Sequence, residues 1–132
     1  MTTARTGTVP AVWTTLVYRD SRTALAFLTS AFGFTERAVH ADGDRIVHAE
    51  LTFTGPEGTS VGGIMFGEGG DPKRIGNGSV HVVTGEPDAL FARAVAGGAT
   101  VVRAPEDTDY GSRQFIVLDP EDNLWSFGTW YE

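Results

Sequence analysis

The stretch that decides the fold is Gly111-Ser-Arg-Gln-Phe-Ile-Val-Leu-Asp-Pro-Glu-Asp-Asn-Leu-Trp-Ser-Phe-Gly128. Two apolar runs, residues 115–118 and 124–127, flank a segment of Asp, Pro, Glu and Asn at residues 119–123. Proline fixes φ, and the side chains of Asp and Asn close turns on their own backbone. The pattern therefore predicts a strand, a tight turn and a second strand.

Upstream of this hairpin, residues 12–67 predict one strand, one helix and three more strands. Asp20-Ser21 is a helix N-cap signal, and apolar residues at three- and four-residue steps predict a helix over 21–32 that ends at Gly33. The strands are expected at residues 12–18, 34–40, 45–54 and 61–67, with a turn at 41–44. Alternation along residues 45–54 places Val47, Ala49, Leu51 and Phe53 on one face and His48, Glu50 and Thr52 on the other.

The same order of elements then repeats after a Gly-rich linker. The repeat consists of a strand at 79–84, a helix opening at 86–88 and ending at 97–98, a strand at 99–104, a loop at 105–111 and the hairpin. Asp20 and Glu86 begin the two helices 66 residues apart, and the last strands align Ile64 with Ser126, 62 residues apart. The predicted fold class is α+β, with two βαβββ modules forming a curved mixed-sheet half-barrel around a cavity.

Length and composition bound what this chain can be. Its 132 residues form one compact domain, divided into a flexible leader (1–10), a first module (11–68), a linker (69–78) and a second module (79–132). The net charge of −7 disfavours nucleic acid and anionic lipid as partners, and no apolar run is long enough to cross a membrane. There is no Cys, and residues 1–10 do not read as a signal peptide, so a cytoplasmic location is expected.

Three segments in this order carry a family resemblance. They are Tyr18-Arg-Asp20 before the first helix, Ala31-Phe-Gly-Phe34 after it, and Tyr110-Gly-Ser-Arg113 running on to Asp119-Pro-Glu-Asp-Asn-Leu-Trp-Ser-Phe127. With the repeat, they make the chain resemble the vicinal oxygen chelate superfamily, the glyoxalase, bleomycin-resistance and dioxygenase group, over residues 12–130. The resemblance implies paired βαβββ modules around a cupped cavity and a homodimer.

The resemblance also implies divalent-metal positions in the first and last strands of each module. In this sequence those positions correspond to Trp13, Ile64, Ser79 and Ser126. Indole and alkyl groups cannot ligate a divalent ion, and a Ser hydroxyl is a poor ligand for transition metals. The chain is therefore expected to bind no metal and no other cofactor, and to be similar to the metal-free members that sequester antibiotics.

The leading functional hypothesis is a metal-independent binding protein for an apolar or aromatic small molecule, cationic ligands included. Glu50 would pair with a ligand cation, and aromatic rings would stack on the ligand. Alternation predicts that Trp13, Ile64 and Phe66 face the cavity and that Trp125 points away from it. The candidate ligand-binding residues are Trp13, His48, Glu50, Ile64, Phe66, His81, Tyr110 and Arg113.

Two other functions stay open from the sequence. One is a glyoxalase-like lyase or dioxygenase-like enzyme that uses His48, Glu50 or His81 for acid/base chemistry or holds a metal at unfamiliar positions. The other is a structural or regulatory dimer whose cavity is filled by Trp13 and Phe66. No residue is assigned a catalytic role, because these His side chains are expected to be ordinary surface or cavity-lining groups.

Overall fold

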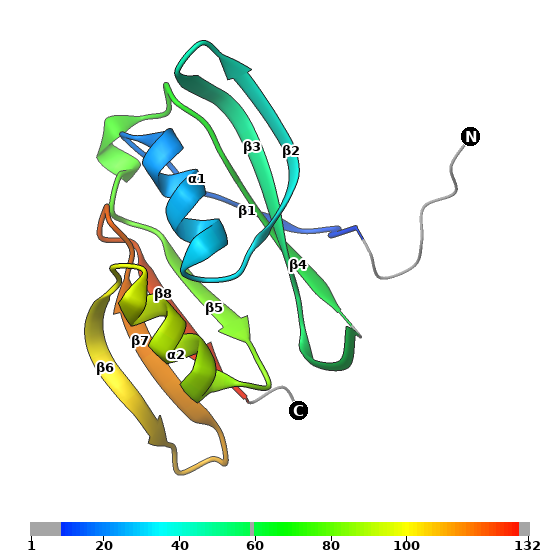
Figure 1. Cartoon of the computed structure of the whole chain (residues 1–132), viewed down its shortest axis with the longest axis vertical. Helices are drawn as coiled ribbons and strands as arrows, with labels where there is room; N and C mark the ends of the chain where they lie inside the picture. The colour runs from blue at the N-terminus through cyan, green and yellow to red at the C-terminus, as the bar shows by residue number, and fades with distance from the viewer. Residues whose placement is uncertain (1–8, 59, 130–132) are drawn as a thin grey trace.

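The computed structural model describes residues 9–58 and 60–129, which form two βαβββ modules (Figure 1). The first module consists of β1 (Trp13–Thr15), α1 (Ser21–Ser30), β2 (Thr35–Asp42), β3 (Arg45–Thr54) and β4 (Val61–Phe66). The second consists of β5 (Ser79–Val83), α2 (Pro87–Ala96), β6 (Thr100–Asp107), β7 (Arg113–Leu118) and β8 (Leu124–Gly128). Two short 3-10 turns, η1 (Pro56–Gly58) and η2 (Pro72–Arg74), lie in the connections on either side of β4.

Each module contains one mixed four-stranded sheet. Sheet A has the strand order β1-β4-β3-β2, and sheet B has the order β5-β8-β7-β6. The outer pairs β1–β4 and β5–β8 are parallel, whereas the other neighbours are antiparallel. The predicted α+β fold of two repeated modules is confirmed. Neither of its helices, within the described part of the chain, has the length and apolar character needed to cross a membrane.

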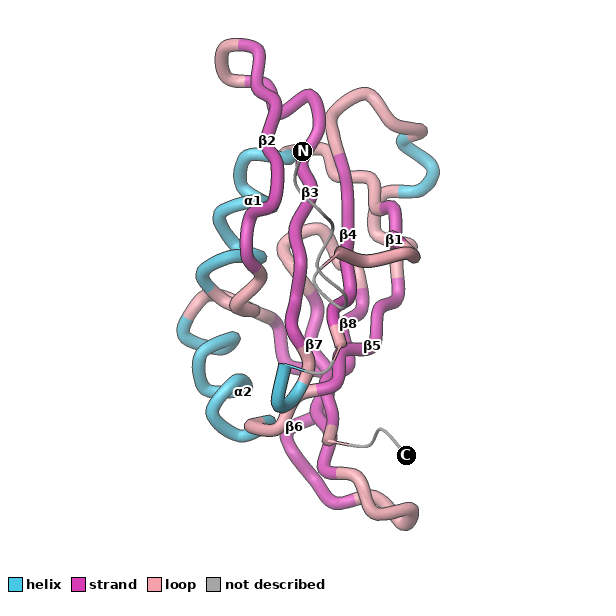
Figure 2. The backbone as a smooth tube through the Cα atoms, turned by 90° about the vertical axis from the view of Figure 1, so that its right-hand side faces the viewer, coloured by secondary structure: helices cyan, strands magenta, loops and turns pink. Residues whose placement is uncertain are grey.

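One hydrophobic core joins the two modules. Helices α1 and α2 lie on the same side of the strands, so that each sheet keeps one face without a helix (Figure 2). Trp125 of β8 is completely buried, and its ring centroid lies 5.0 Å from that of Phe32 and 5.6 Å from that of Phe34 in the other module. Trp125 therefore points to the core, as its place in the alternation predicts.

The turn of the last hairpin fastens the second module to the first. The buried Asp119 carboxylate accepts a hydrogen bond from the Tyr18 hydroxyl at 2.5 Å and another from Trp125 Nε1 at 3.0 Å. Glu121 accepts the backbone N–H groups of Arg19 and Asp20 at 2.6 and 2.8 Å. Two of the segments that carry the family resemblance therefore contact each other at the interface of the two modules.

The first helix begins where its cap predicts. The Asp20 side chain accepts the backbone N–H of Thr23 at 3.0 Å, which satisfies one of the free donors of the first turn. The helix ends at Ser30, two residues before the predicted end, because the chain turns there and carries Phe32 into the core.

Strand β3 contains a bulge that alternation alone does not predict. The register with β2 shifts between His40 and Ala41, so that Val47 is an extra residue on β3. Ile46 and Ala49 both face the core, while Val47 is 48% exposed. The predicted face is therefore wrong for Val47, and it is right for the residues from Ala49 onward.

The predicted alignment of the last strands is wrong by one residue. Leu51 pairs with Ile64, and its counterpart Val117 pairs with Trp125, so Ile64 corresponds to Trp125 and Met65 corresponds to Ser126. The connection between β3 and β4 adds one residue more than the alignment allowed, which reverses the faces of β4. Ile64 and Phe66 consequently point to the core, each 2% exposed.

The edges of the predicted elements differ in two further places. Strand β6 continues through Pro105 to Asp107, because an edge strand tolerates a residue that cannot donate a ladder hydrogen bond. The Gly-rich segment before β5 contains η2, and Gly78 at its end donates its N–H to Asn123 Oδ1 at 2.7 Å. Of the predicted leader, residues 1–8 lie outside the described residues, and Pro10 is buried.

Candidate functional site: a cleft between the modules

A cleft of about 490 Å³ lies where the first module meets β5 of the second. Residues of β4 and β5 both line it, together with Thr14 of β1. Most of its lining is apolar. The residues that line it are Ala11, Val12, Thr14, Phe34, Phe53, Gly55, Ser60, Val61, Gly62, Gly63, Ile64, Val80, His81, Val82 and Val83.

Two strands supply the walls of this cleft. In β4 a side chain at Gly62 would share the face of Ile64, and an added Cβ at Gly62 would meet no atom within 4 Å. The absence of a side chain there leaves space that a larger residue would fill. In β5, Val80 and Val82 are the core-facing residues that line the cleft. Phe34 and Phe53 also line it and pack together, with ring centroids 5.2 Å apart.

His81 is the only ionisable side chain among the described residues that line this cleft. It lies on β5 directly opposite Ser126 of β8, and its Nδ1 is 2.7 Å from Ser126 Oγ. Partial burial lowers the pKa of His81 below its ordinary value, because burial disfavours the charged imidazolium. The neutral ring, held by a hydroxyl, therefore sits at the border of an apolar space.

A second group of predicted residues lies on the open face of sheet A, the face without a helix. The Trp13 ring lies against the backbone of Gly63, where an added Cβ would come within 2.5 Å of Trp13 Cε3. The Arg37 guanidinium is 5.8 Å from the Trp13 ring centroid and forms an ion pair with Glu50. Glu50 also lies 2.9 Å from His48 Nε2.

The charge of Glu50 is thus already balanced within the protein. The hydrogen bond with His48, followed by that from Arg37, lowers the pKa of Glu50 below its ordinary value. His40 stacks beside His48, with ring centroids 6.2 Å apart. None of Trp13, His48 and Glu50 lines the cleft.

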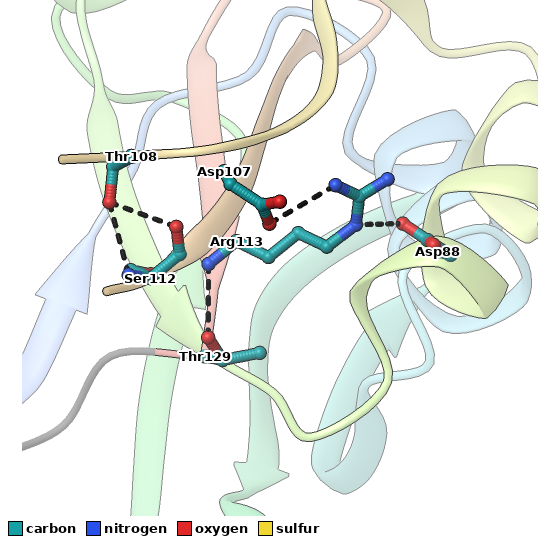
Figure 3. A network of polar contacts seen from close by, with 6 residues as sticks. All are labelled: Asp88, Asp107, Thr108, Ser112, Arg113 and Thr129. Carbon is teal, nitrogen blue, oxygen red and sulfur yellow. Dashed lines mark hydrogen bonds and ion pairs between the residues drawn. The ribbon is translucent and has the colours of Figure 1, made fainter. Parts of the chain in front are cut away.

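The two candidates near the last hairpin lie in another part of the second module. Arg113 donates hydrogen bonds to Asp88 at 2.9 Å and to Asp107 at 3.2 Å (Figure 3). The bond to Asp88, and then the bond to Asp107, raises the pKa of Arg113 above its ordinary value. Tyr110 is largely exposed and donates its hydroxyl to Gln114 Oε1 at 3.2 Å. These contacts tie the β6–β7 loop to the first turn of α2.

The eight predicted residues therefore separate into four groups. Ile64 and His81 line the cleft, while Trp13, His48 and Glu50 gather on the open face of sheet A. Phe66 is a core residue whose ring centroid is 5.1 Å from that of Tyr18, and the contacts of Tyr110 and Arg113 lie within the second module.

Sequence reasoning missed most of the cleft lining. The valines of β5 belong to the apolar face of a strand and carry no chemical motif, so only the meeting of β4 with β5 identifies them. The one available signal was the pair Gly62-Gly63 inside a strand, since glycine there often marks a close approach of another group.

The donor groups do not fit the metal that the family resemblance implies. With the corrected register, Met65 and not Ile64 is the first-module counterpart of Ser126. Met65 pairs with Thr15 of β1, and Ser126 pairs with His81 of β5. Within residues 9–58 and 60–129 no three His, Cys, Asp or Glu residues gather closely enough to hold a metal ion. A single imidazole with thioether and hydroxyl neighbours is a poor site for a divalent metal, which takes several imidazole, carboxylate or thiolate ligands.

Comparison with known proteins agrees with this architecture. An uncharacterised protein of Mycobacterium bovis is 35% identical over 126 residues, which cover 90% of this chain and 82% of that protein. The crystal structure of TioX from Micromonospora sp. ML1 is 29% identical, with a TM-score of 0.70 over 88% of this chain and 94% of that one. TnmS3, an antibiotic binding protein from Streptomyces sp. CB03234, has a TM-score of 0.66 at 19% identity over 96% of each chain, which shows the fold alone.

A family model covers almost the whole described chain. The match extends over residues 11–127. The chain belongs to the glyoxalase/bleomycin resistance protein/dioxygenase superfamily.

Proposed function

We propose that this chain is a metal-independent small-molecule binding protein that holds an apolar or aromatic ligand in the cleft between its modules. The observation that carries the proposal is the cleft itself, with a volume of about 490 Å³ and a lining dominated by Val, Phe, Ile and Gly. Small-molecule sites in proteins are typically concave, about 300–1,000 Å³ in volume, and apolar with a few placed polar groups.

The expectation that the ligand can be cationic is not part of this proposal. It rested on Glu50, whose carboxylate is paired with Arg37 and His48 on the open face of sheet A. No Asp or Glu stands among the described residues that line the cleft, so a ligand cation would have no counter-ion there.

The biological role that fits this binding is sequestration. A protein that keeps an antibiotic bound lowers its free concentration without any chemical step. The description of TnmS3 as an antibiotic binding protein supports this role for a chain of the same fold. Affinity would come from apolar area removed from water and from the few polar groups at the border of the cleft.

The sharpest test fills the cleft without disturbing the rest of the protein. In Gly62→Leu the new Cβ meets no atom within 4 Å, and the φ of Gly62 does not require glycine. We expect this variant to keep the wild-type melting temperature and to lose at least tenfold in affinity for 2-methylnaphthalene, because a leucine takes up the ligand's space. Binding is measured by equilibrium dialysis, and the metal content of the untagged protein by elemental analysis.

The matched control is Thr100→Leu, which adds a leucine on the exposed edge strand β6. It should bind 2-methylnaphthalene like the wild type. Equal affinity of the wild type and Gly62→Leu would show that the cleft is not the binding site. A stoichiometric transition metal in the purified protein would overturn the metal-independent part of the proposal.

Homodimerisation, which the family resemblance implies, stays a prediction. Each sheet has one face without a helix, and a second copy could cover such a face (Figure 2). Sedimentation equilibrium decides between the monomer mass of 14.1 kDa and twice that mass.

A further inference from the structure

The cleft has very little polar chemistry for a ligand to use. Its described lining contains three polar side chains, those of Thr14, Ser60 and His81, and no Asp, Glu, Lys or Arg. A buried ligand group that can form hydrogen bonds needs a partner, because an unpaired one loses its bonds to water. The nature of these three groups therefore limits which ligands the cleft can hold.

His81 is the strongest of the three hydrogen-bonding groups. Ser126 Oγ lies 2.7 Å from Nδ1, which fixes the orientation of the ring across the β5–β8 pair. Nε2 has no hydrogen-bond partner among residues 9–58 and 60–129, so it is free for a ligand. The hydroxyl can donate to Nδ1 or accept from it, so that Nε2 can be a donor or an acceptor.

The charge of the His81 ring also limits the charge of the ligand that can bind. The pKa of His81 is lowered by partial burial, so the imidazole is uncharged near neutral pH and offers a hydrogen bond but no counter-charge. The net charge of the whole chain is −7, which disfavours an anionic ligand as well. An uncharged ligand needs no counter-charge in the cleft and is not repelled by the net charge of the chain.

We infer that His81 is the polar anchor of the cleft, and that the cleft takes an uncharged, mainly apolar ring compound with one hydroxyl or carbonyl oxygen hydrogen-bonded to His81 Nε2. This inference rests on the proposed function and narrows it to a class of ligand. His81 acts by contact with the ligand, and Ser126 acts as a positioning residue through the ring.

The test compares two molecules of almost the same shape. The probes are 2-naphthol, which carries a hydroxyl, and 2-methylnaphthalene, which carries a methyl group in its place. Their dissociation constants are measured by equilibrium dialysis at pH 7.5 for the wild type, His81→Phe and His40→Phe. The ratio of the two constants cancels what both probes share, so its change between proteins isolates the hydrogen bond.

In His81→Phe we expect 2-naphthol to lose about fivefold in affinity relative to 2-methylnaphthalene, which is the usual size of one net hydrogen bond. His40→Phe should keep the wild-type ratio, because His40 lies on β2 and does not line the cleft. In the wild type, 2-naphthol should also shift the ¹⁵N NMR signal of His81 Nε2, and 2-methylnaphthalene should shift it much less.

Three outcomes would count against the inference, and they are distinguishable. If both probes bind the wild type and their ratio is the same in His81→Phe, the anchor is wrong while the proposed function survives. If 2-naphthoate binds the wild type more tightly than 2-naphthol, the ring acts as a cation and the uncharged class is wrong. If neither naphthalene probe binds the wild type, the proposed function fails together with the inference.

Discussion

At the scale of single residues, the most heavily bonded group is the buried carboxylate of Asp119. It accepts hydrogen bonds from Tyr18, Trp125 and both the backbone and side chain of Asn123, as well as the backbone N–H of Glu121. Burial, followed by the negative charge of Asp119, raises the pKa of Tyr18 above its ordinary value, so the phenol stays protonated and donates. The polar residues of the turn at 119–123 therefore stabilise the folded protein.

Replacing this carboxylate should strongly destabilise the protein. In Asp119→Ala the hydroxyl of Tyr18 and the indole N–H of Trp125 lose their acceptor inside the core, and each such loss costs about 1–3 kcal/mol. We expect the free energy of unfolding to fall by about 3 kcal/mol or more in urea titrations. Tyr18→Phe removes one donor and leaves the carboxylate its other partners, so its loss should be only about 1 kcal/mol. Similar losses for the two variants would contradict this account.

At the scale of elements, the helix starts show how local chemistry positions the modules. Asp20 caps α1 with its own side chain, whereas Glu86 at the start of α2 makes no such bond and Pro87 opens the helix instead. The hydrogen bonds from the Thr23 hydroxyl and then from the Thr23 backbone N–H lower the pKa of Asp20 below its ordinary value of 3.8. The α1 cap therefore depends on an ionised carboxylate.

This cap should make stability depend on pH in a defined direction. A carboxyl whose pKa is lower in the folded state stabilises the protein above its unfolded pKa, and that contribution disappears as the pH falls through the folded value. We expect Asp20→Asn to be slightly less stable than the wild type at pH 6, and the two melting temperatures to converge as the pH falls below about 3.8. Asp20→Ala, which lacks any cap, should cost about 1 kcal/mol at pH 6. If the melting temperatures of Asp20→Asn and the wild type differ by the same amount at every pH, the charge of Asp20 does not contribute to the cap.

At the scale of the whole molecule, the ends of the two helices lock the modules together. Arg93 of α2 donates to the carbonyl oxygens of Ser30 at 2.8 Å and Thr29 at 3.2 Å, at the end of α1. Gly97 lies so close to Ala31 that an added Cβ would come within 2.5 Å of the alanine Cβ. This close approach is a contact between the two modules, whose residues together line the cleft.

A single methyl group at Gly97 should therefore weaken the docking of the modules. Its φ of −83° suits any residue, so Gly97→Ala tests the contact with Ala31 and not the backbone conformation. We expect a loss of about 1–3 kcal/mol in urea unfolding, as is usual for overpacked contacts. The matched control is Gly62→Ala, whose added Cβ would have open space and should change stability by less than about 0.5 kcal/mol. Equal stability of Gly97→Ala and the wild type would show that the contact between Gly97 and Ala31 does not limit how the modules dock.

The order of elements and the type of fold could be predicted from the sequence, because they depend on local signals. The caps at Asp20 and Gly97 and the hairpin turn at residues 119–123 each act within a few residues, and the repeat can be read directly from the residue numbers. Of the predicted ligand-binding residues, Ile64 and His81 line the candidate cleft, and their role there stays a prediction. The predicted side-chain faces were wrong where a strand or a connection contains one extra residue, as at Val47 and before β4. A shift of one residue places the following side chains on the opposite face of the sheet.

The amino-acid sequence by itself determined the two repeated modules and the superfamily. The tertiary structure decided the rest. Only folding brings Gly62 of β4 and Val82 of β5 into the lining of one cleft, pairs His81 with Ser126 and places Glu50 between Arg37 and His48. The physical reason is that a cleft belongs to the meeting of two surfaces, and the packing of Ala31 against Gly97 and the bonds of Asp119 to Tyr18 set that meeting between residues far apart in the chain.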